Sequence, residues 1–234
     1  MTDTVLYLLF LAALVLSVVA QIKVSSTFRK FSRISAVAGR SGAEVARRIL
    51  DAHGLFDIKI EKIGGELSDH YDPRTRTLRL SAGVYASSSA AAVGVAAHEV
   101  GHAIQHSEGY APLKFRTSLV PMVNFASRFS WIAIILGIVV ISLSELYSAL
   151  GSYILFGGIV LFAVTTLFHL VTLPVEVNAS GRALRELEIL GWYSSEDLGA
   201  AKKVLSAAAM TYIAALAVSV IQLLRLLSMF RGRD

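Results

Sequence analysis

Two histidines and a glutamate near the middle of the chain carry its clearest chemistry. Residues 98–102 read His-Glu-Val-Gly-His, and the Ser-, Ala- and Val-rich run before them favours a helix. Positions four apart lie on one helical face, so His98 and His102 can reach one cation, and neutral imidazole is a good zinc ligand. Glu99 stands where this motif places the general base. The competing interpretation is a buried, alanine-rich helix with two incidental histidines.

A zinc site of this kind needs a third ligand, and the residues directly after the motif do not supply an obvious one. A metzincin-type extension would require Gly at 105 and His at 108, whereas the chain has Gln105 and Glu108. His106 stays near the same helical face. Because one straight helix cannot readily wrap three ligands around one ion, we interpret His106 as an outer-shell or surface residue.

The favoured third ligand is Glu176, within Leu-Pro-Val-Glu-Val-Asn-Ala-Ser at 173–180. Pro174 is typical of the first turn of a helix, where its missing N–H costs nothing. Glu176 would then project from a second helix and complete a His2Glu site like that of thermolysin-type enzymes. Alternatively, Glu176 only offsets the dipole at a helix N-terminus.

These residues resemble the YugP-like neutral zinc metallopeptidases of bacterial membranes. The resemblance covers most of the chain, including the hydrophobic N-terminal segment and motifs at 68–74, 77–81, 98–105 and 173–180. It implies a membrane-bound peptidase with one zinc ion per chain, His98 and His102 as ligands and Glu99 as the catalytic acid and base. The chain is also distantly similar to the HtpX and CAAX-prenyl protease group. In that group a Glu on a later helix completes the site, which supports Glu176.

The resemblance has one departure close to the predicted zinc ligand. The HtpX and CAAX-prenyl proteases carry an acidic residue four positions after the ligand Glu, where this chain has Ser180. The YugP-like pattern has Asp where this chain has Asn178. We therefore expect Asn178 and Ser180 to be the outer-shell positions of the site.

Composition places the protein in a membrane. The chain has 234 residues, of which 55% are hydrophobic, and it has no cysteine and a formal net charge of +5. This is too apolar for an ordinary soluble domain, and no disulfide framework is possible. The basic residues cluster beside hydrophobic runs, so the positive-inside rule explains the charge better than nucleic-acid binding does.

Residues 4–22 form the first apolar run, which has the length of a membrane span. No basic residue precedes it, and Lys23, Arg29, Lys30 and Arg33 follow it. A cleaved signal peptide would show the opposite arrangement. We therefore expect an uncleaved anchor with its N-terminus outside and residues 23–128 in the cytoplasm.

Two further apolar runs predict a transmembrane helical hairpin over 129–173. The turn at 144–148 has no basic residue, as expected outside the cell. The hairpin returns the cytoplasmic segment 174–203, with Glu176, to the side of residues 23–128. Residues 204–230 are apolar and long enough to span, although Arg231 and Arg233 would then lie outside, against the positive-inside bias. We favour spanning; the alternative is a helix that lies against the catalytic part.

The segment 23–128 is expected to be the zincin-like part. Ser41 and Glu44 form a capping box that predicts a helix through Ala52. Alternating patterns predict strands over 56–63, 68–72 and 77–81. An edge strand here could pair with an extended peptide, or the hairpin could simply cover the histidine helix. Candidate oxyanion donors are His70, Tyr71 and Tyr85, although the sequence favours an ordinary turn or core role for each of them.

Together these patterns predict a mainly α protein with a small β-hairpin or sheet, namely a multi-span helical membrane protein with a zincin-like catalytic domain. The favoured function is a zinc metallopeptidase that acts on a peptide or membrane-protein substrate at the cytoplasmic face of the lipid bilayer. The same site could serve a non-peptide zinc hydrolase or a zinc-stapled membrane scaffold. A transporter is disfavoured, because His169 is the only ionisable candidate within the first three spans.

Overall fold

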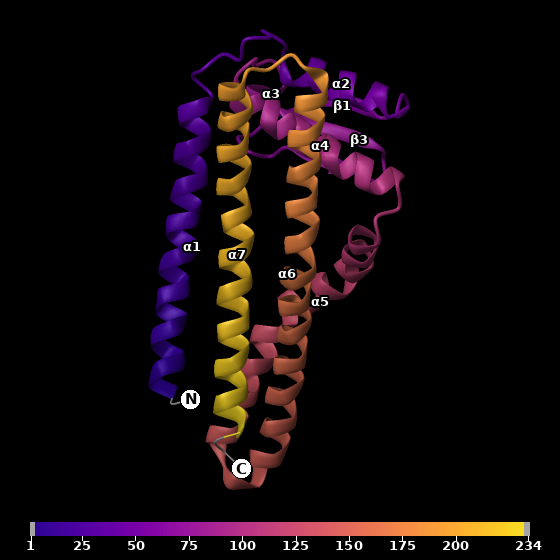
Figure 1. The fold of residues 1–234 in the computed structure, drawn as a ribbon. Coiled ribbons are helices and arrows are strands. Elements are labelled where there is room, and N and C mark those ends of the chain that lie inside the picture. Colours follow the sequence, from indigo (N-terminus) through magenta and orange to yellow (C-terminus); the bar gives the residue numbers. More distant parts are fainter. Residues whose placement is uncertain (1–2, 232–234) are drawn as a thin grey trace. The chain divides into compact units, whose positions relative to one another are not determined.

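The computed structural model describes residues 3–231, and this part of the chain is mainly helical with one small sheet (Figure 1). The helices are α1 (Asp3–Phe31), α2 (Gly42–Ala52), α3 (Ala82–Tyr85), α4 (Ala90–Ser107), α5 (Ala111–Leu143), α6 (Ser148–Leu190) and α7 (Ser195–Arg231). The strands are β1 (Lys59–Ile63), β2 (His70–Asp72) and β3 (Thr77–Ser81), and a short 3₁₀ turn covers Glu145–Tyr147. The predicted fold class, mainly helical with a small sheet, is confirmed.

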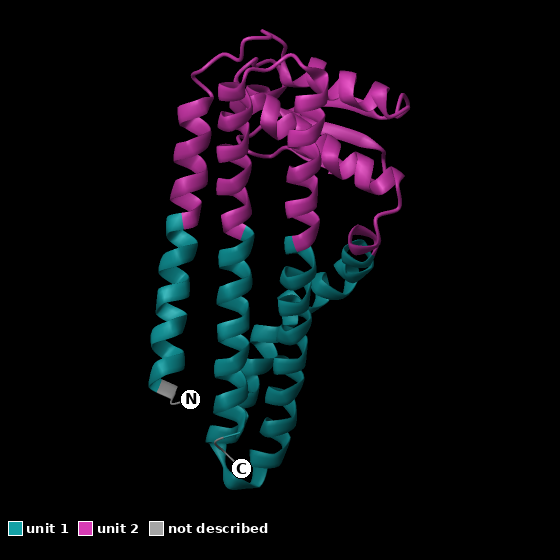
Figure 2. Cartoon of the chain, in the orientation of Figure 1, with its two compact units in different colours: residues 1–19, 115–173, 212–234 teal, residues 20–114, 174–211 magenta. Residues whose placement is uncertain are grey.

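The chain divides into two compact units (Figure 2). Unit 1 comprises residues 1–19, 115–173 and 212–234, and unit 2 comprises residues 20–114 and 174–211. Unit 2 therefore combines most of the predicted zincin-like segment 23–128 with residues 174–211, whereas residues 115–128 belong to unit 1. Unit 2 contains the sheet, the helices α2, α3 and α4, and the adjoining parts of the long helices.

The core of unit 2 forms where α2, α4 and the sheet pack together. The predicted capping box at the start of α2 is confirmed, with Ser41 and Glu44 each bonding the other's backbone. The helix ends at Ala52, and Gly54 follows with a φ of +69°. Fully buried side chains join these elements, among them Val45, Ile49, Leu50, Ile58, Leu78, Leu80, Val100 and Ile104. Burial of each such side chain contributes about 1.5–3 kcal/mol, so this core fixes α4 against the sheet.

The sheet has the order β1-β3-β2, with β2 antiparallel and β1 parallel to the central strand. The β2–β3 hairpin was predicted, and the turn after Asp72 is closed by hydrogen bonds from Arg74 N–H and the Thr75 hydroxyl to the Asp72 carboxylate. The prediction of a strand from residue 56 was wrong at its start. Strand β1 begins at Lys59, and two turns, at residues 53–54 and 56–57, precede it.

In unit 1, α5 and α6 form an antiparallel helical hairpin that depends on glycine. A Cβ on Gly137 would lie 2.5 Å from the backbone N of Leu155, and one on Gly158 would lie 2.7 Å from the backbone N of Ile134. Small residues allow apolar helices to approach this closely. A buried apolar cluster lies beside this contact, formed by Ile134 of α5, by Leu155, Ile159 and Phe162 of α6, and by Leu226 of α7.

Two predicted helix starts differ from the structure. The hairpin was predicted to begin at residue 129, but its first helix, α5, begins at Ala111 and carries Pro121 within it. Pro174 does not begin a helix but lies inside the continuous α6. Proline removes one intrahelical hydrogen bond, yet helices in apolar surroundings tolerate it where neighbouring groups satisfy the backbone. Glu176 therefore lies on α6 itself and not at a helix N-terminus.

The later helix boundaries follow the sequence signals. Helix α6 ends at Leu190, and Gly191 follows with a φ of +65°. Ser194 and Asp197 exchange hydrogen bonds at the start of α7. Within residues 3–231, the helices α1, α5, α6 and α7 are long and apolar enough to cross a membrane. Arg233 lies outside the described residues.

Candidate metal centre

Helix α4 presents the His-Glu-Val-Gly-His motif on a rigid, buried scaffold. Ser89 caps the helix by accepting a hydrogen bond from Ala92 N–H. His98 and His102 lie one turn apart, and their rings meet edge to face with centroids 4.8 Å apart. The alanines around them are buried. Because the two histidines are four residues apart, their imidazoles lie on one face of α4.

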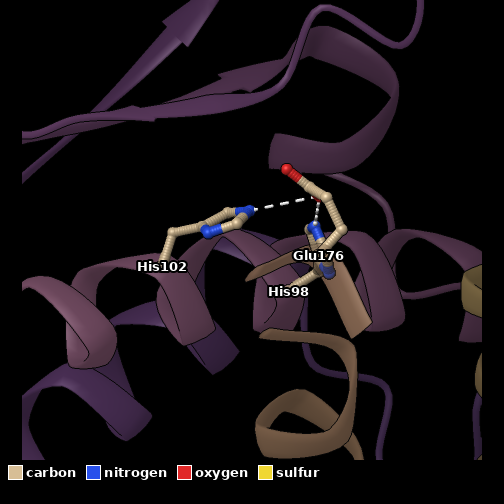
Figure 3. Close-up of side chains that lie close together, drawn as sticks. All are labelled: His98, His102 and Glu176. Carbon is tan, nitrogen blue, oxygen red and sulfur yellow. Dashed lines mark hydrogen bonds and ion pairs between the residues drawn. The ribbon is translucent and has the colours of Figure 1, made fainter. Parts of the chain in front are cut away.

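The structure brings Glu176 of α6 to the two histidines (Figure 3). Its carboxylate Oε2 lies 3.2 Å from Nε2 of His98 and 3.5 Å from Nε2 of His102. Ligand atoms of all three residues lie within 4.8 Å of one another. Glu176 is buried and is separated from His98 by 78 positions in the chain. The third ligand expected from the sequence is thus positioned beside the first two.

The donor set and its spacing fit a zinc ion. Two ligands that lie about 2.0–2.2 Å from a tetrahedral zinc are roughly 3.3–3.6 Å apart. The two measured nitrogen–oxygen distances, 3.2 Å and 3.5 Å, are close to this range. Among the described residues, the group of possible ligands contains only His98, His102 and Glu176. Two imidazoles and one carboxylate leave a coordination position open, which is typical of catalytic zinc sites.

Each histidine is oriented by a hydrogen bond at its other ring nitrogen. Nδ1 of His98 lies 3.1 Å from the Ser180 hydroxyl, and Nδ1 of His102 lies 3.0 Å from Oε1 of Gln105. Because the amide oxygen can only accept, Nδ1 of His102 carries the proton and Nε2 is left as a ligand atom. The expected outer-shell position Ser180 thus contacts a predicted ligand directly.

Gln105 is a component of the site that the sequence analysis did not assign. It is fully buried, and its Nε2 donates to the carbonyl of Val175 and to Oδ1 of Asn178, both at 2.9 Å. Gln105 therefore joins His102 on α4 to the turn of α6 that carries Glu176. Asn178, the other expected outer-shell position, is hydrogen-bonded to Gln105 and therefore lies one hydrogen bond further from His102. The sequence offers one signal for this role of Gln105. It follows His102 by three residues, and this spacing places the two side chains on one helical face.

Gly101, between the two histidines, allows α4 and α6 to approach. A Cβ at this position would lie 2.6 Å from the carbonyl oxygen of Ala179 and 3.3 Å from its Cα. Any larger residue would push the α6 backbone away between Glu176 and Ser180. The glycine is therefore needed for the distance between the ligands, and not for backbone flexibility.

The electrostatics of the cluster favour a cation. Burial by itself would raise the pKa of the Glu176 carboxyl, but the imidazoles of His102 and His98 outweigh it and the pKa is lowered. Burial by itself would lower the pKa of His102, but Glu176 and Glu99 outweigh it and the pKa is raised. The buried carboxylate thus requires positive charge beside it, which a bound metal ion supplies.

Glu99 points from α4 to the edge strand β2. Its Oε2 accepts a hydrogen bond of 3.1 Å from the backbone N–H of Tyr71, and its side chain is largely buried. It is not a member of the ligand group, as expected of a general base. Because Tyr71 N–H is already engaged, the strand in this state covers the histidine helix, one of the two roles that the sequence left open.

The remaining candidate residues have other contacts. The Tyr71 hydroxyl lies 2.9 Å from Nδ1 of His106, and this places His106 at the sheet and outside the ligand group. Burial lowers the pKa of His106, with help from Arg76 and Lys114. Nδ1 of His70 lies 2.9 Å from the carbonyl of Ser68, and Tyr85 packs at the margin of the core.

Comparison with known proteins identifies the class to which this fold and site belong. The chain belongs to the family described as "Putative neutral zinc metallopeptidase", whose model matches residues 6–231. The resemblance predicted from the motifs is therefore confirmed. Positions 98, 102 and 176 lie within the matched range.

One relative is the "Putative membrane protease YugP" of Bacillus subtilis (strain 168). It is 47% identical over 228 residues, which cover 97% of this chain and 97% of that protein. The similarity thus extends over the apolar helices as well as the candidate metal centre. No solved structure matches the chain.

Proposed function

We propose that the protein is a membrane-bound zinc endopeptidase with a zincin-like catalytic part. His98, His102 and Glu176 hold one zinc ion per chain, and Glu99 is the general base. The observation that carries the proposal is the convergence of these ligands from α4 and α6 at distances close to those of tetrahedral zinc. Membership of a family described as zinc metallopeptidases supports the same reaction.

Different residues of the chain have different roles in the proposed reaction. When bound, zinc lowers the pKa of a coordinated water to about 7 and polarises a carbonyl group. Glu99 removes the proton of the attacking water and later returns it to the leaving amine. Ser180 and Gln105 hold the two imidazoles in the orientation that presents Nε2. Release of Glu99 from Tyr71 N–H would free the carboxylate for this role.

Two other functions use the same ligands. A structural zinc staple would normally be closed by four protein ligands, and His106, four residues after His102, would be the residue to supply the fourth. His106 instead contacts the Tyr71 hydroxyl, which favours an open and catalytic site. A non-peptide amide or ester hydrolase would need the same geometry, so the substrate has to be identified by experiment.

Replacement of the general base tests the reaction. Glu99→Gln should keep zinc, because Glu99 lies outside the ligand group, and should lower peptidase turnover by roughly 10²–10⁴-fold, the range of acid–base catalysis. Quantitative proteomics of intact membranes that contain the parent or the variant would identify the peptides that accumulate or disappear. Parent turnover in a zinc-loaded Glu99→Gln protein would refute the assignment.

Replacement of the third ligand separates metal binding from catalysis. Glu176→Gln should weaken zinc binding and abolish hydrolysis, because a neutral amide replaces the buried carboxylate between the two imidazoles. Glu188→Gln, at an exposed position on the same helix, is the control and should change neither. Zinc content after mild chelation is the measurement. If Glu176→Gln keeps zinc as tightly as the parent, the third ligand lies elsewhere.

The proposal includes a multi-pass arrangement with the site facing the cytoplasm, where it meets a peptide or membrane-protein substrate. The basic residues after the first span and the absence of basic residues from the hairpin turn at 144–148 support this orientation. A membrane-impermeant thiol reagent should label Ser148→Cys in intact cells and leave Ser68→Cys unlabelled until the cells are lysed. The reverse pattern would place the site outside.

A further inference from the structure

A groove distant in sequence from the metal ligands runs between the later part of α1 and the first turns of α7, all within unit 2. It has a volume of about 710 Å³. Its lining combines four lysines, two hydroxyls and an apolar floor, from Lys23, Thr27, Lys30, Phe31, Gly199, Lys202, Lys203, Ser206, Ala207 and Met210. Two of the lysines come from each helix, although the helices are more than 160 positions apart in the chain.

The positive charge of this groove is not balanced by the protein. No acidic residue lines it, and none of the four lysines forms a salt bridge among the described residues. Lys30 and Lys203 both lie over the ring of Phe31, at 5.4 Å and 5.8 Å from its centroid. Phe31 therefore holds one ammonium group from each helix at the same place, and mutual repulsion of these charges remains uncompensated.

We propose that this groove binds the headgroup of an anionic phospholipid. The phosphate would accept hydrogen bonds from the lysines and from the hydroxyls of Thr27 and Ser206, while an acyl chain would lie along Ala207 and Met210. A soluble anion would leave the apolar floor uncovered, and a neutral lipid would leave the four charges unbalanced. Basic pockets between helices at the cytoplasmic ends of membrane spans bind anionic headgroups by the same chemistry.

Lipid in this groove would also stabilise the catalytic scaffold. Helix α7 packs against α4 beside the groove, where a Cβ on Gly94 would lie 3.1 Å from Cβ of Ala201. Ala201 directly precedes Lys202 and Lys203 in the chain. Because the lipid would join α1 to α7 and α7 supports the helix of the metal ligands, binding should raise the thermal stability of the whole unit.

The test uses the delipidated full-length protein in detergent, with native mass spectrometry for bound lipid and thermal unfolding for stability. Phosphatidylglycerol should bind and raise Tm, whereas phosphatidylcholine should not. The fourfold variant Lys23→Gln, Lys30→Gln, Lys202→Gln and Lys203→Gln should bind phosphatidylglycerol on the order of 10³-fold more weakly, since each lysine near the headgroup contributes about fivefold.

Two matched variants separate the groove from general charge and from misfolding. The control removes four exposed basic residues elsewhere in unit 2, through Arg48→Gln, Lys59→Gln, Lys62→Gln and Arg74→Gln, and should bind lipid like the parent. Replacement of the four groove lysines by arginine should preserve binding. Equal weakening in the groove and control variants would overturn the proposal. So would an equal rise in Tm with inorganic phosphate, which would show a soluble-anion site.

Discussion

Each half of α6 packs closely against another helix at glycine residues, but the two contacts contain different kinds of side chain. Residues 148–173 pack against α5 in unit 1, where Gly137 and Gly158 allow the backbones to approach. Residues 174–190 pack against α4 in unit 2, where Gly101 does the same. The first contact is filled with apolar side chains, whereas the second contains a carboxylate, two imidazoles and a buried amide.

The difference shows that close helix approach alone does not define a site. In the α5–α6 hairpin the small residues increase van der Waals contact, which stabilises helix pairs in apolar surroundings. In the α4–α6 contact the glycine sets the distance at which polar groups meet, and every buried polar group there needs a partner. A small change in separation should therefore affect stability in the hairpin but metal affinity at the histidines.

The largest effect is expected at Gly101. Gly101→Ala places a Cβ against the Ala179 carbonyl, and overpacking of this kind typically costs about 1–3 kcal/mol. Zinc affinity should fall by up to about 10²-fold as Glu176 is displaced from the histidines, since 1.4 kcal/mol corresponds to a factor of ten. Gly181→Ala is the control, because a Cβ there meets nothing within 4 Å and alanine favours the helix. Zinc titration that shows the same affinity for both variants would contradict this role of Gly101.

An intermediate effect is expected at Gln105. Gln105→Leu keeps the side-chain volume but leaves Nδ1 of His102 and the Val175 carbonyl without their partner. Loss of an outer-shell partner typically costs 10- to 100-fold in metal affinity or activity, so zinc affinity should fall by about that factor. Ser180→Ala should produce a similar loss through His98. If Gln105→Leu changes only the unfolding temperature and not zinc affinity, Gln105 is a core residue and not part of the site.

Local sequence signals predicted much of this arrangement. The capping box at Ser41, the end of α2 at Ala52 and the β2–β3 hairpin each depend on residues within a few positions of one another. The pairing of Glu176 with the histidines was also predicted, because a hairpin between two soluble segments returns the chain to the side it left. Local chemistry and chain topology were sufficient for these features.

The features that were missed depend on contacts between segments far apart in the chain. Proline is typical of the first turn of a helix, so the sequence predicted a helix start at Pro174, whereas α6 continues through this residue. The parallel pairing of β1 with β3 depends on tertiary contacts. The alternating pattern within a strand does not predict which other strand it pairs with. Gln105 gives no sign of its role until Val175 and Asn178 are placed beside it.

The smallest effect on zinc affinity is expected from substitutions in the α5–α6 hairpin. Gly158→Ala would place a Cβ 2.7 Å from the backbone N of Ile134 and 3.0 Å from the carbonyl of Ser130, so the α5–α6 contact must open. The neighbouring Gly157→Ala meets nothing within 4 Å and is the control. We expect Gly158→Ala to lower the Tm of the detergent-solubilised protein relative to Gly157→Ala, while both keep parental zinc affinity. The contacts of Gly158 named here lie in unit 1, and the contacts of the proposed metal ligands described above lie in unit 2. A loss of zinc affinity in Gly158→Ala beyond about threefold would show that the two halves of α6 are coupled, since independent sites contribute additively.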